Sequence, residues 1–459
     1  MRFRRSMRLA VCTAALLAGI MPQIRAQSGA TQTAQAPVAA DSQSPSSTQQ
    51  AYTLPPDKLE KAIQLSRIRN ILSIGGSVWG LVFLWLTLAT RTWAWMESWA
   101  EKISGRRWIQ GAILFAAYLI VATLAGLPLD WIGEHYERSY GISVQSWGGW
   151  IGDEGKLLGL TLAVGVPVML LFHWIVRRWP RRYWLGAWAV TLPILAFLTF
   201  IEPLVVPLFF KQEPLKKNHA ALVEKLETVV ARTGINIPPD RMYLLKAGAK
   251  FTGMNAFVAG MGPTKRYVMW DTTTDQLPSD EILFIFGHES GHYVLHHIPK
   301  GFALSAVGLF FVFWACAGFA AWMVRRFGAR WGTNDLHPTD EDLSVGTPAL
   351  SSRTGFVVLL FAVSIASFLL EPVSNAVSRH FEHQADVYGQ EAIHGIVPDP
   401  QKTAVAAFNA LGRSWLDDPN PNAFIEFWLY DHPSTQHRAD FALHYDPWAN
   451  GGHGEFFKN

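Results

Sequence analysis

The sequence predicts an all-α membrane protein with several spans, joined to two long solvated segments that contain a few short strands. Of its 459 residues, 50 % are hydrophobic and only 16 % are charged, whereas a soluble domain carries about 25 % charged residues. This apolar content excludes a wholly disordered chain. The formal net charge of +3 gives no reason to expect a nucleic-acid partner. With Cys12 and Cys316 as its two cysteines, the chain cannot be a disulfide scaffold.

The N-terminal residues have the layout of a targeting segment. In residues 1–26 a basic start is followed by a short apolar run from Leu9 to Met21, and Ala26 is a small residue suited to cleavage. We therefore predict a signal peptide over 1–26, with an uncleaved signal anchor as the alternative. Residues 27–50 are rich in Gln, Ser, Thr, Ala and Pro and are predicted to be a disordered tether.

Apolar stretches of about 20 residues, the length that crosses a bilayer, predict six spans. Trp and Tyr stand at several of their ends, as in an interfacial aromatic belt. The predicted spans are 72–90, 109–129, 157–176, 183–205, 302–324 and 354–370. The first four form an N-terminal transmembrane domain over 51–208. The last two lie inside a second domain over 209–459.

Basic residues favour one orientation in the lipid bilayer. Arginines cluster after the first, third and fifth spans, for example at 177–182 and 325–330. The positive-inside rule then places the exits of the odd-numbered spans in the cytoplasm. Both long solvated segments, 211–300 and 371–459, fall on the opposite side. We therefore expect a multi-pass plasma membrane protein of a bacterium whose solvated segments face the periplasm.

The first solvated segment combines one helix with short strands. Apolar residues recur at helical spacing over 216–233, which predicts an amphipathic helix. Short strands are predicted at 242–245, 256–259 and 267–270. The last two strands flank a Gly-rich turn at 260–264, which indicates a hairpin.

A helix that follows these strands carries a metal-binding pattern. His288 and His292 are four residues apart, so a helix places both imidazoles on one face. Glu289 stands beside the first histidine and can accept a proton from an attacking water. This is the HExxH pattern of zinc peptidases. A pair of surface histidines is the alternative, which explains poorly why the pattern lies in an apolar helix that ends at a span.

A catalytic zinc site needs a third protein ligand and one open position. Glu382 and Asp386, four apart on a later helix, supply candidates: Glu382 as the ligand, and Asp386 as the acceptor that orients a zinc-bound histidine. His383 is the rival ligand, and an ion-paired surface helix is the other interpretation. His297 is expected to make a polar contact near the pair without binding the metal.

The two motifs together resemble those of a known family. His288-Glu-Ser-Gly-His292, with Asn375-x-x-Ser-Arg-x-x-Glu382-x-x-Ala-Asp386, is similar to the integral-membrane zinc metallopeptidases of the CAAX prenyl protease (a-factor-converting) family. The resemblance extends from about residue 52 to about 446 and includes further segments at 140–147, 203–209, 255–256 and 432–438.

The resemblance implies a fold and a set of roles. The fold is a multi-span helical barrel around an internal chamber, capped by a zincin-type peptidase domain. His288, His292 and Glu382 would bind one Zn²⁺, and Glu289 would be the general base. His432 and Arg438 match residues near the scissile carbonyl, and Asn255-Ala256 match the edge strand that binds an extended peptide.

The predicted function is therefore that of a zinc metalloendopeptidase acting on extended segments of membrane-associated proteins or peptides. A general quality-control protease for membrane proteins is one alternative, and a non-enzymatic scaffold with a structural metal is another. The signal-like N-terminus and the periplasmic orientation both argue against prenylated cytosolic proteins as substrates.

Overall fold

The protein is described by a computed structural model. It describes residues 50–260, 262–333, 350 and 352–458. The predicted signal peptide over 1–26 lies outside the described residues, as does the predicted tether over 27–50 apart from its last residue.

Six helices in the described ranges are long and apolar enough to cross a membrane, as the sequence predicts. They are α2 (Pro56–Ala89), α4 (Arg107–Ser139), α5 (Trp147–Arg178), α6 (Tyr183–Val205), α10 (His297–Trp331) and α12 (Arg353–Ile393). Most are longer than the predicted apolar stretches, because the helices continue into polar sequence beyond the part that a bilayer would cover. The longest, α12, has 41 residues, which is about 60 Å of helix.

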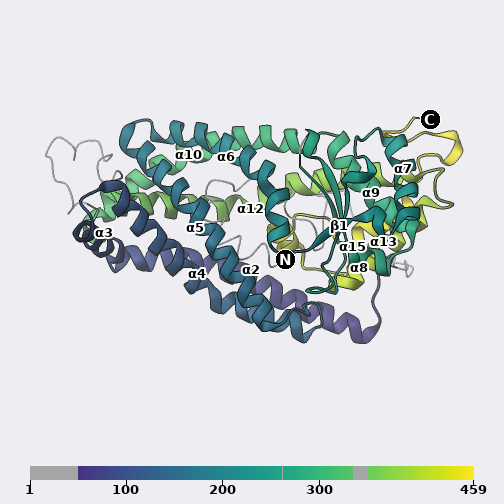
Figure 1. The fold of residues 1–459 in the computed structure, drawn as a ribbon, viewed down its shortest axis with the longest axis horizontal. Helices are drawn as coiled ribbons and strands as arrows, with labels where there is room; N and C mark the ends of the chain where they lie inside the picture. The colour runs from purple at the N-terminus through teal and green to yellow at the C-terminus, as the bar shows by residue number, and fades with distance from the viewer. Residues whose placement is uncertain (1–49, 261, 334–349, 351, 459) are drawn as a thin grey trace, which may run out of the picture.

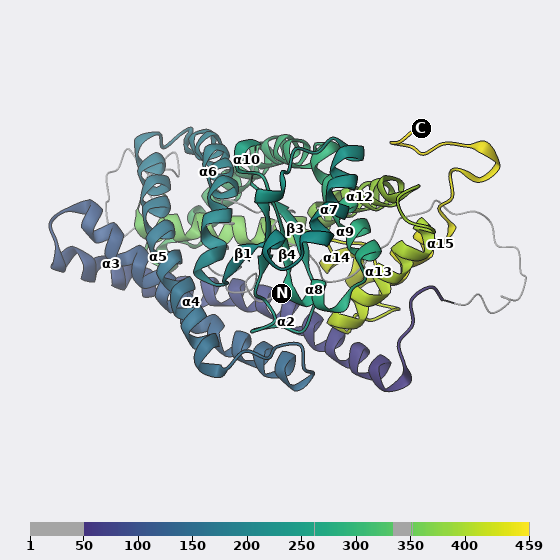
Figure 2. The same cartoon turned by 45° about the vertical axis from the view of Figure 1, so that its right-hand side comes forward.

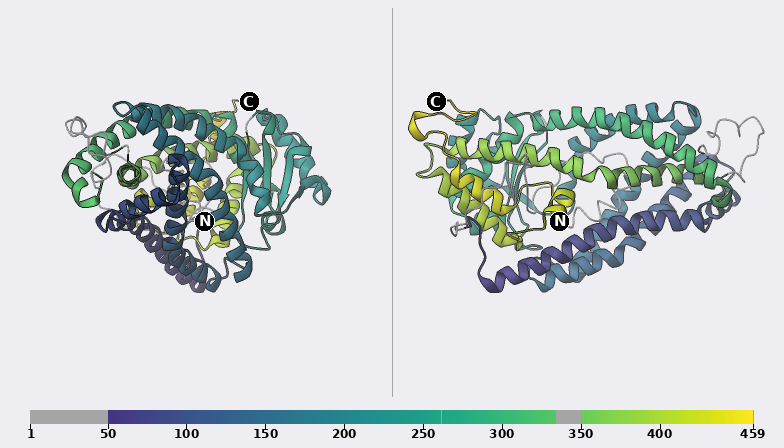
Figure 3. Two further views of the ribbon diagram at one scale, coloured as in Figure 1. Left: turned by 60° about the vertical axis from the view of Figure 1, so that its left-hand side comes forward. Right: turned by 180° about the vertical axis from the view of Figure 1, so that it is seen from behind.

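The long helices form a barrel at one end of the molecule, and a small sheet with shorter helices lies at the other end (Figure 1; Figure 3, left). The shorter helices near the sheet are α7 (Ala220–Thr233), α8 (Asp271–Gln276), α9 (Ser279–Val294), α13 (Pro400–Trp415), α14 (Ala423–Leu429) and α15 (Thr435–His444). Helix α3 (Thr92–Ile103) lies instead at the barrel end (Figure 1). The predicted fold class, a helical membrane barrel with a mostly α peptidase domain, is therefore confirmed.

Within the described ranges, four strands form one sheet in the order β1-β2-β4-β3. They are β1 (Gln212–Pro214), β2 (Met242–Leu245), β3 (Ala256–Ala259) and β4 (Arg266–Trp270). β3 and β4 form the predicted antiparallel hairpin, and β2 pairs in parallel with β4. Strand β1 was not expected from the sequence. The order leaves β3 at an edge of the sheet, on the side where α9 packs (Figure 2).

Helix α12 differs from its predicted extent. The sequence suggested that the sixth span ends near Leu370, before Glu371-Pro372. Instead α12 continues through Pro372 to Ile393. Proline removes one backbone hydrogen bond, but almost all of the residues from Phe381 to Ile393 are buried, and this packing offsets the loss. One helix therefore reaches from the barrel into the metal-binding region.

The buried side chain of Arg69 joins two N-terminal helices to the C-terminal part of the chain. Arg69 on α2 donates two hydrogen bonds to the carboxylate of Glu137 on α4, both at 2.9 Å. It also donates to the backbone carbonyl of Trp415, the last residue of α13, at 2.8 Å. Since all three groups come from different parts of the chain, this contact fixes the N-terminal helices against the C-terminal domain.

Candidate metal centre

Helices α9 and α12 approach each other closely where two glycines face one another. A Cβ atom on Gly389 would lie 2.8 Å from the backbone nitrogen of His288, and one on Gly287 would lie 3.1 Å from the carbonyl oxygen of Gly389. Larger residues would therefore push the two helices apart. The close packing brings His288 of α9 opposite Glu382 and Asp386 of α12.

The three predicted ligands meet at this contact. The Nε2 atoms of His288 and His292 are 3.2 Å apart. The carboxylate of Glu382 lies 3.3 Å from Nε2 of His288 and 3.5 Å from Nε2 of His292. One donor atom from each residue lies within 4.8 Å of the other two. Two imidazole nitrogens and one carboxylate, converging in this way, fit a divalent transition metal.

The surroundings of the cluster suit metal binding and proton transfer. Burial lowers the pKa of His292 to about 3, so its imidazole is neutral and can act as a ligand. Burial raises the pKa of Glu289 to about 7, so its carboxyl group can take up or release a proton near neutral pH. The Glu289 carboxylate accepts a hydrogen bond from the backbone N–H of Val258 in β3 at 3.3 Å. Glu289 therefore lies between the cluster and the edge of the sheet.

Asp386 contacts His288 at its Nδ1 atom, and Arg438 in turn holds Asp386. The Asp386 carboxylate lies 2.8 Å from Nδ1 of His288. Arg438 of α15 donates to both carboxylate oxygens of Asp386, at 2.8 and 2.5 Å. The guanidinium also lies over the ring of Phe408, 4.5 Å from its centroid. Arg438 is thus paired with Asp386, and its guanidinium also lies 3.7 Å from the carboxylate of Glu382.

His432 reaches the cluster from the segment between α14 and α15. Its Nε2 lies 3.2 Å from Oε1 of Glu382. Its Nδ1 is 2.9 Å from the carboxylate of Asp431, and both side chains are buried. The sequence predicts a role for His432, whereas the contribution of Asp431 emerges from the structure. The adjacent Asp-His pair was a signal, since a carboxylate commonly orients a functional imidazole through its second nitrogen.

His297 is the further histidine in contact with the cluster. Its Nδ1 lies 3.0 Å from Nδ1 of His292, and its Nε2 lies 3.1 Å from the side-chain oxygen of Gln384. The ring also stacks on Phe381 at 4.5 Å between centroids. His297 therefore contacts Nδ1 of His292, the nitrogen that faces away from the proposed metal. This is the polar contact near the histidine pair that the sequence predicts. Gln384, on α12, was not foreseen.

Asn255 and Ala256 lie at the start of the edge strand and differ in what they offer. The carbonyl of Asn255 accepts from Trp270, and its N–H donates to Thr273, so both backbone groups are used within the fold. Its side-chain Oδ1 is buried and has no hydrogen-bond partner among the described residues. In an antiparallel pair the bonding direction alternates, so the backbone groups of Ala256 and Val258 point away from β4.

Comparison with known proteins agrees with this class of fold and site. Residues 216–445 match the model of peptidase family M48, and residues 35–211 match the model described as "CAAX prenyl protease N-terminal, five membrane helices". A membrane barrel that carries a His-His-Glu cluster on such a domain defines an integral-membrane metalloprotease. The chain belongs to the CAAX prenyl protease family of membrane metallopeptidases.

Individual relatives span most of the chain. An uncharacterized metalloprotease of Bacillus subtilis, YhfN, is 30 % identical over 398 residues, which cover 85 % of this chain and 87 % of the relative. CAAX prenyl protease 1 of Saccharomyces cerevisiae is 25 % identical over 400 residues, with 83 % and 85 % covered. The crystal structure of Ste24p from S. mikatae superposes with a TM-score of 0.72, covers 97 % of both chains and is 19 % identical. This last likeness supports the fold.

Proposed function

We propose that the protein is a zinc endopeptidase in which His288, His292 and Glu382 hold the metal. The observation that carries the proposal is the convergence of these three donors beside the buried carboxylate of Glu289. Three protein ligands leave one position open, as in catalytic zinc sites. When bound, zinc would supply a Lewis acid that polarises the scissile carbonyl.

Glu289 is the general base in this proposal. Its pKa of about 7 allows it to take a proton from the attacking water and to pass that proton to the leaving amine. The hydrogen bond from Val258 keeps the carboxylate directed toward the edge strand. A peptide bond held along that strand would therefore lie next to the base.

His432 is positioned to stabilise the oxyanion that forms during hydrolysis. Asp431 fixes the ring through Nδ1, so that Nε2 is presented to the cluster beside Glu382. A donor at this place would act where negative charge develops. Arg438 was expected to share this role. Its two hydrogen bonds to Asp386 favour instead a positioning role, in which it holds Asp386 against His288.

The edge strand β3 is the proposed substrate-binding element. The outward backbone groups of Ala256 and the carbonyl of Val258 would pair with an extended peptide by strand addition, while the N–H of Val258 donates to Glu289. The unpaired Oδ1 of Asn255 adds a side-chain acceptor at the start of the same edge. Because backbone groups provide the pairing, we expect the enzyme to accept extended segments of differing sequence.

The membrane-spanning barrel favours membrane-associated proteins or peptides as substrates. Relatives from yeast and human are named CAAX prenyl proteases or homologues of one. We propose a bacterial plasma membrane as the location, with the metal centre facing the periplasm and a domain boundary near residue 208. Comparative proteomics of membranes with the wild-type protein and with Glu289→Gln would identify the substrates. Accumulation of many unrelated membrane proteins in the variant would favour a quality-control protease over a selective one.

Metal removal tests the proposed ligands. Dialysis against a chelator should abolish hydrolysis of a reporter peptide, and Zn²⁺ should restore it.

Glu382→Gln should lose both the metal and hydrolysis. His383→Ala is the matched control, because His383 packs on Phe441 with centroids 4.6 Å apart and should not affect metal content. Loss of zinc from His383→Ala, with Glu382→Gln unaffected, would overturn the assignment. Bound metal without any hydrolysis in the wild type would favour a structural metal in a scaffold.

A further inference from the structure

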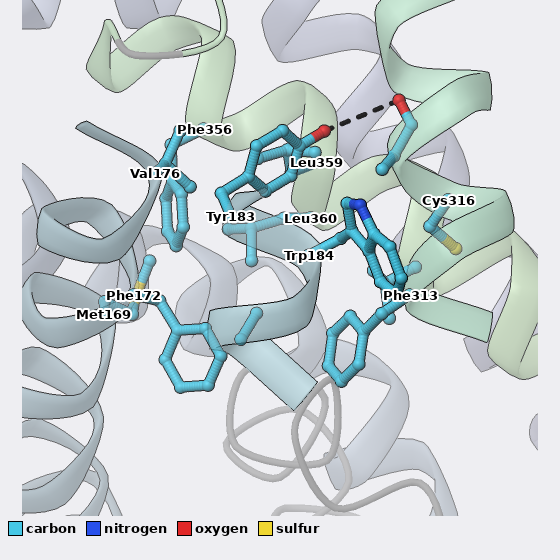
Figure 4. Close-up of a pocket in the computed structure, with 13 residues that line it drawn as sticks. Met169, Phe172, Val176, Tyr183, Trp184, Phe313, Cys316, Phe356, Leu359 and Leu360 are labelled. Atoms are coloured by element: carbon cyan, nitrogen blue, oxygen red, sulfur yellow. Dashed lines mark hydrogen bonds between the residues drawn. The ribbon is translucent and has the colours of Figure 1, made fainter. Parts of the chain in front are cut away.

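An apolar cavity lies between the membrane-spanning helices, apart from the metal centre (Figure 4). It is lined by side chains of α5, α6, α10 and α12. Its walls are mainly aromatic and aliphatic side chains, among them Val176, Tyr183, Trp184, Phe313, Cys316 and Leu360. The Tyr183 hydroxyl, a polar group at the wall, is directed at the backbone carbonyl of Ala317 at 3.5 Å. Such a cavity favours hydrocarbon over water.

The cavity is too far from the metal centre to be part of it. Val363 lines the cavity and Glu382 belongs to the centre, and both lie on the continuous helix α12. Their 19 intervening steps correspond to ~28 Å along the helix at ~1.5 Å per residue. A hydrocarbon group attached to the substrate beside the scissile bond would therefore have to span this distance to enter the cavity while that bond is at the metal.

A dense group of arginines adjoins the cavity. Val176 and Tyr183 line it, and the chain between them reads Arg177-Arg178-Trp179-Pro180-Arg181-Arg182. All four arginines are exposed. In the part of the chain that the structure describes, no salt bridge joins any of them to a carboxylate. Four unneutralised cations thus stand at the end of an apolar cavity that opens within the spans.

We propose that the cavity and this arginine turn bind one anionic phospholipid of the bilayer. Part of one acyl chain would enter the space between α5, α6, α10 and α12, and the phosphate would pair with Arg181 and Arg182. Basic residues next to grooves between spans are suited to anionic headgroups, and guanidinium groups pair well with phosphate oxygens. Trp179 and Trp184 stand next to these arginines in the sequence, and tryptophan is enriched at the headgroup level of membrane proteins.

Lipid affinity of the delipidated full-length protein tests the charge requirement. The probes are phosphatidylglycerol and phosphatidylcholine, titrated in detergent and counted by native mass spectrometry. Wild-type protein should retain phosphatidylglycerol preferentially. The double variant Arg181→Gln/Arg182→Gln should bind it about 25-fold more weakly, since each surface arginine contributes roughly fivefold.

The matched control is Arg325→Gln/Arg326→Gln. These arginines are also exposed at a span end but do not adjoin the cavity, so this variant should bind phosphatidylglycerol as the wild type does. Equal affinity of the wild type for the two lipids would overturn the proposal. So would an equal loss of affinity in the two double variants, because this would indicate a non-specific charge effect.

Cys316 provides a second measurement inside the cavity. It is a buried free cysteine of the described chain, and Cys12→Ser would remove the other thiol. Phosphatidylglycerol should slow alkylation of Cys316 by N-ethylmaleimide, and this protection should be lost in Arg181→Gln/Arg182→Gln. Protection by a farnesylated peptide but not by phosphatidylglycerol would overturn the proposal and assign the cavity to substrate.

Discussion

At the residue scale, each imidazole of the centre is held through its second nitrogen. His288 contacts Asp386, His292 contacts His297, and His432 contacts Asp431. Such contacts fix the tautomer and the orientation of a ring and thereby tune its ligand or donor strength. The supporting residues therefore form two groups. Asp386 and His297 contact the proposed zinc ligands, and Asp431 contacts the proposed oxyanion donor.

The first group is tested by Asp386→Ala. Removing the carboxylate leaves Nδ1 of His288 without its acceptor and frees Arg438, so zinc affinity should fall about 10–100-fold. Zinc content after dialysis against a graded series of chelators measures the change. Unchanged retention of zinc would show that Asp386 does not support the ligand.

The second group is tested by Asp431→Ala, which should slow hydrolysis without lowering zinc affinity. Zinc affinity should stay at the wild-type value, because Asp431 orients the ring of His432, which is not one of the three proposed ligands. Hydrolysis should slow by up to about 100-fold, the scale of losing an oriented oxyanion donor. The two measurements are kcat on a reporter peptide and zinc content of the same sample. A loss of zinc together with activity would move Asp431 into the first group.

At the element scale, α12 connects a buried network in the barrel with the metal centre. The carboxylate of Glu97 on α3 accepts hydrogen bonds from the backbone N–H groups of Arg353 and Thr354, at 3.1 and 3.0 Å. It also pairs with the Arg353 guanidinium at 3.1 Å. Glu97 thus caps the N-terminus of the helix that carries Glu382 about 30 residues later.

Breaking this pair should destabilise the protein strongly. Glu97→Leu removes the nearer of the two carboxylates that pair with the buried Arg353 guanidinium, the other being Glu101 at 3.7 Å. Loss of one partner of a buried ion pair typically costs about 3–5 kcal/mol. Thermal unfolding in detergent should show a lowered Tm, and the double variant Glu97→Leu/Arg353→Met should recover most of it. Lys402→Ala, which removes an exposed ion pair with Asp399, is the control and should leave Tm unchanged. A Tm for Glu97→Leu equal to that of Lys402→Ala would contradict this account.

Element-level patterns in the sequence predicted the parts of the site that depend on local spacing. His288 with His292, and Glu382 with Asp386, are each one helical turn apart, and a helix alone places each pair on one face. The contact between the two helices could not be read from spacing, since it depends on Gly287 facing Gly389. Such a close approach arises only when both helices are present.

Partners from distant segments were the least predictable part. The Asp431-His432 pair is a signal in the sequence, but its place at the cluster depends on the way its segment turns toward Glu382. Gln384 contacts His297 across 87 residues of sequence, for which no local pattern exists. Pro372 suggested a helix end, but the burial of the residues beyond it keeps α12 continuous. In each case tertiary packing decided the outcome.

At the scale of the whole molecule, charge is distributed unequally along the barrel. The low charged fraction of 16 % is explained by six long apolar helices. The arginine turn at 177–182 lies at the end of α5, whereas the metal centre lies with the sheet and α9, at the end of the molecule opposite α3 (Figure 1). If the positive-inside rule applies, the two regions face opposite sides of the membrane.

A reporter fusion tests this orientation. An alkaline phosphatase domain fused after Asn459 folds into an active enzyme only in the periplasm. We expect high phosphatase activity from this fusion and little from a matched fusion placed directly after Arg182. Activity from the second fusion alone would reverse the proposed orientation without affecting the metal centre.

The most direct test of the central claim is a paired measurement on Glu289→Gln. The proposed ligands remain in this variant, but the group that takes the proton is lost. We predict that it retains one zinc per chain and hydrolyses casein or a reporter peptide at least about 100-fold more slowly than the wild type. Hydrolysis at the wild-type rate with zinc bound would contradict the role of Glu289 as general base, and with it the proposed mechanism.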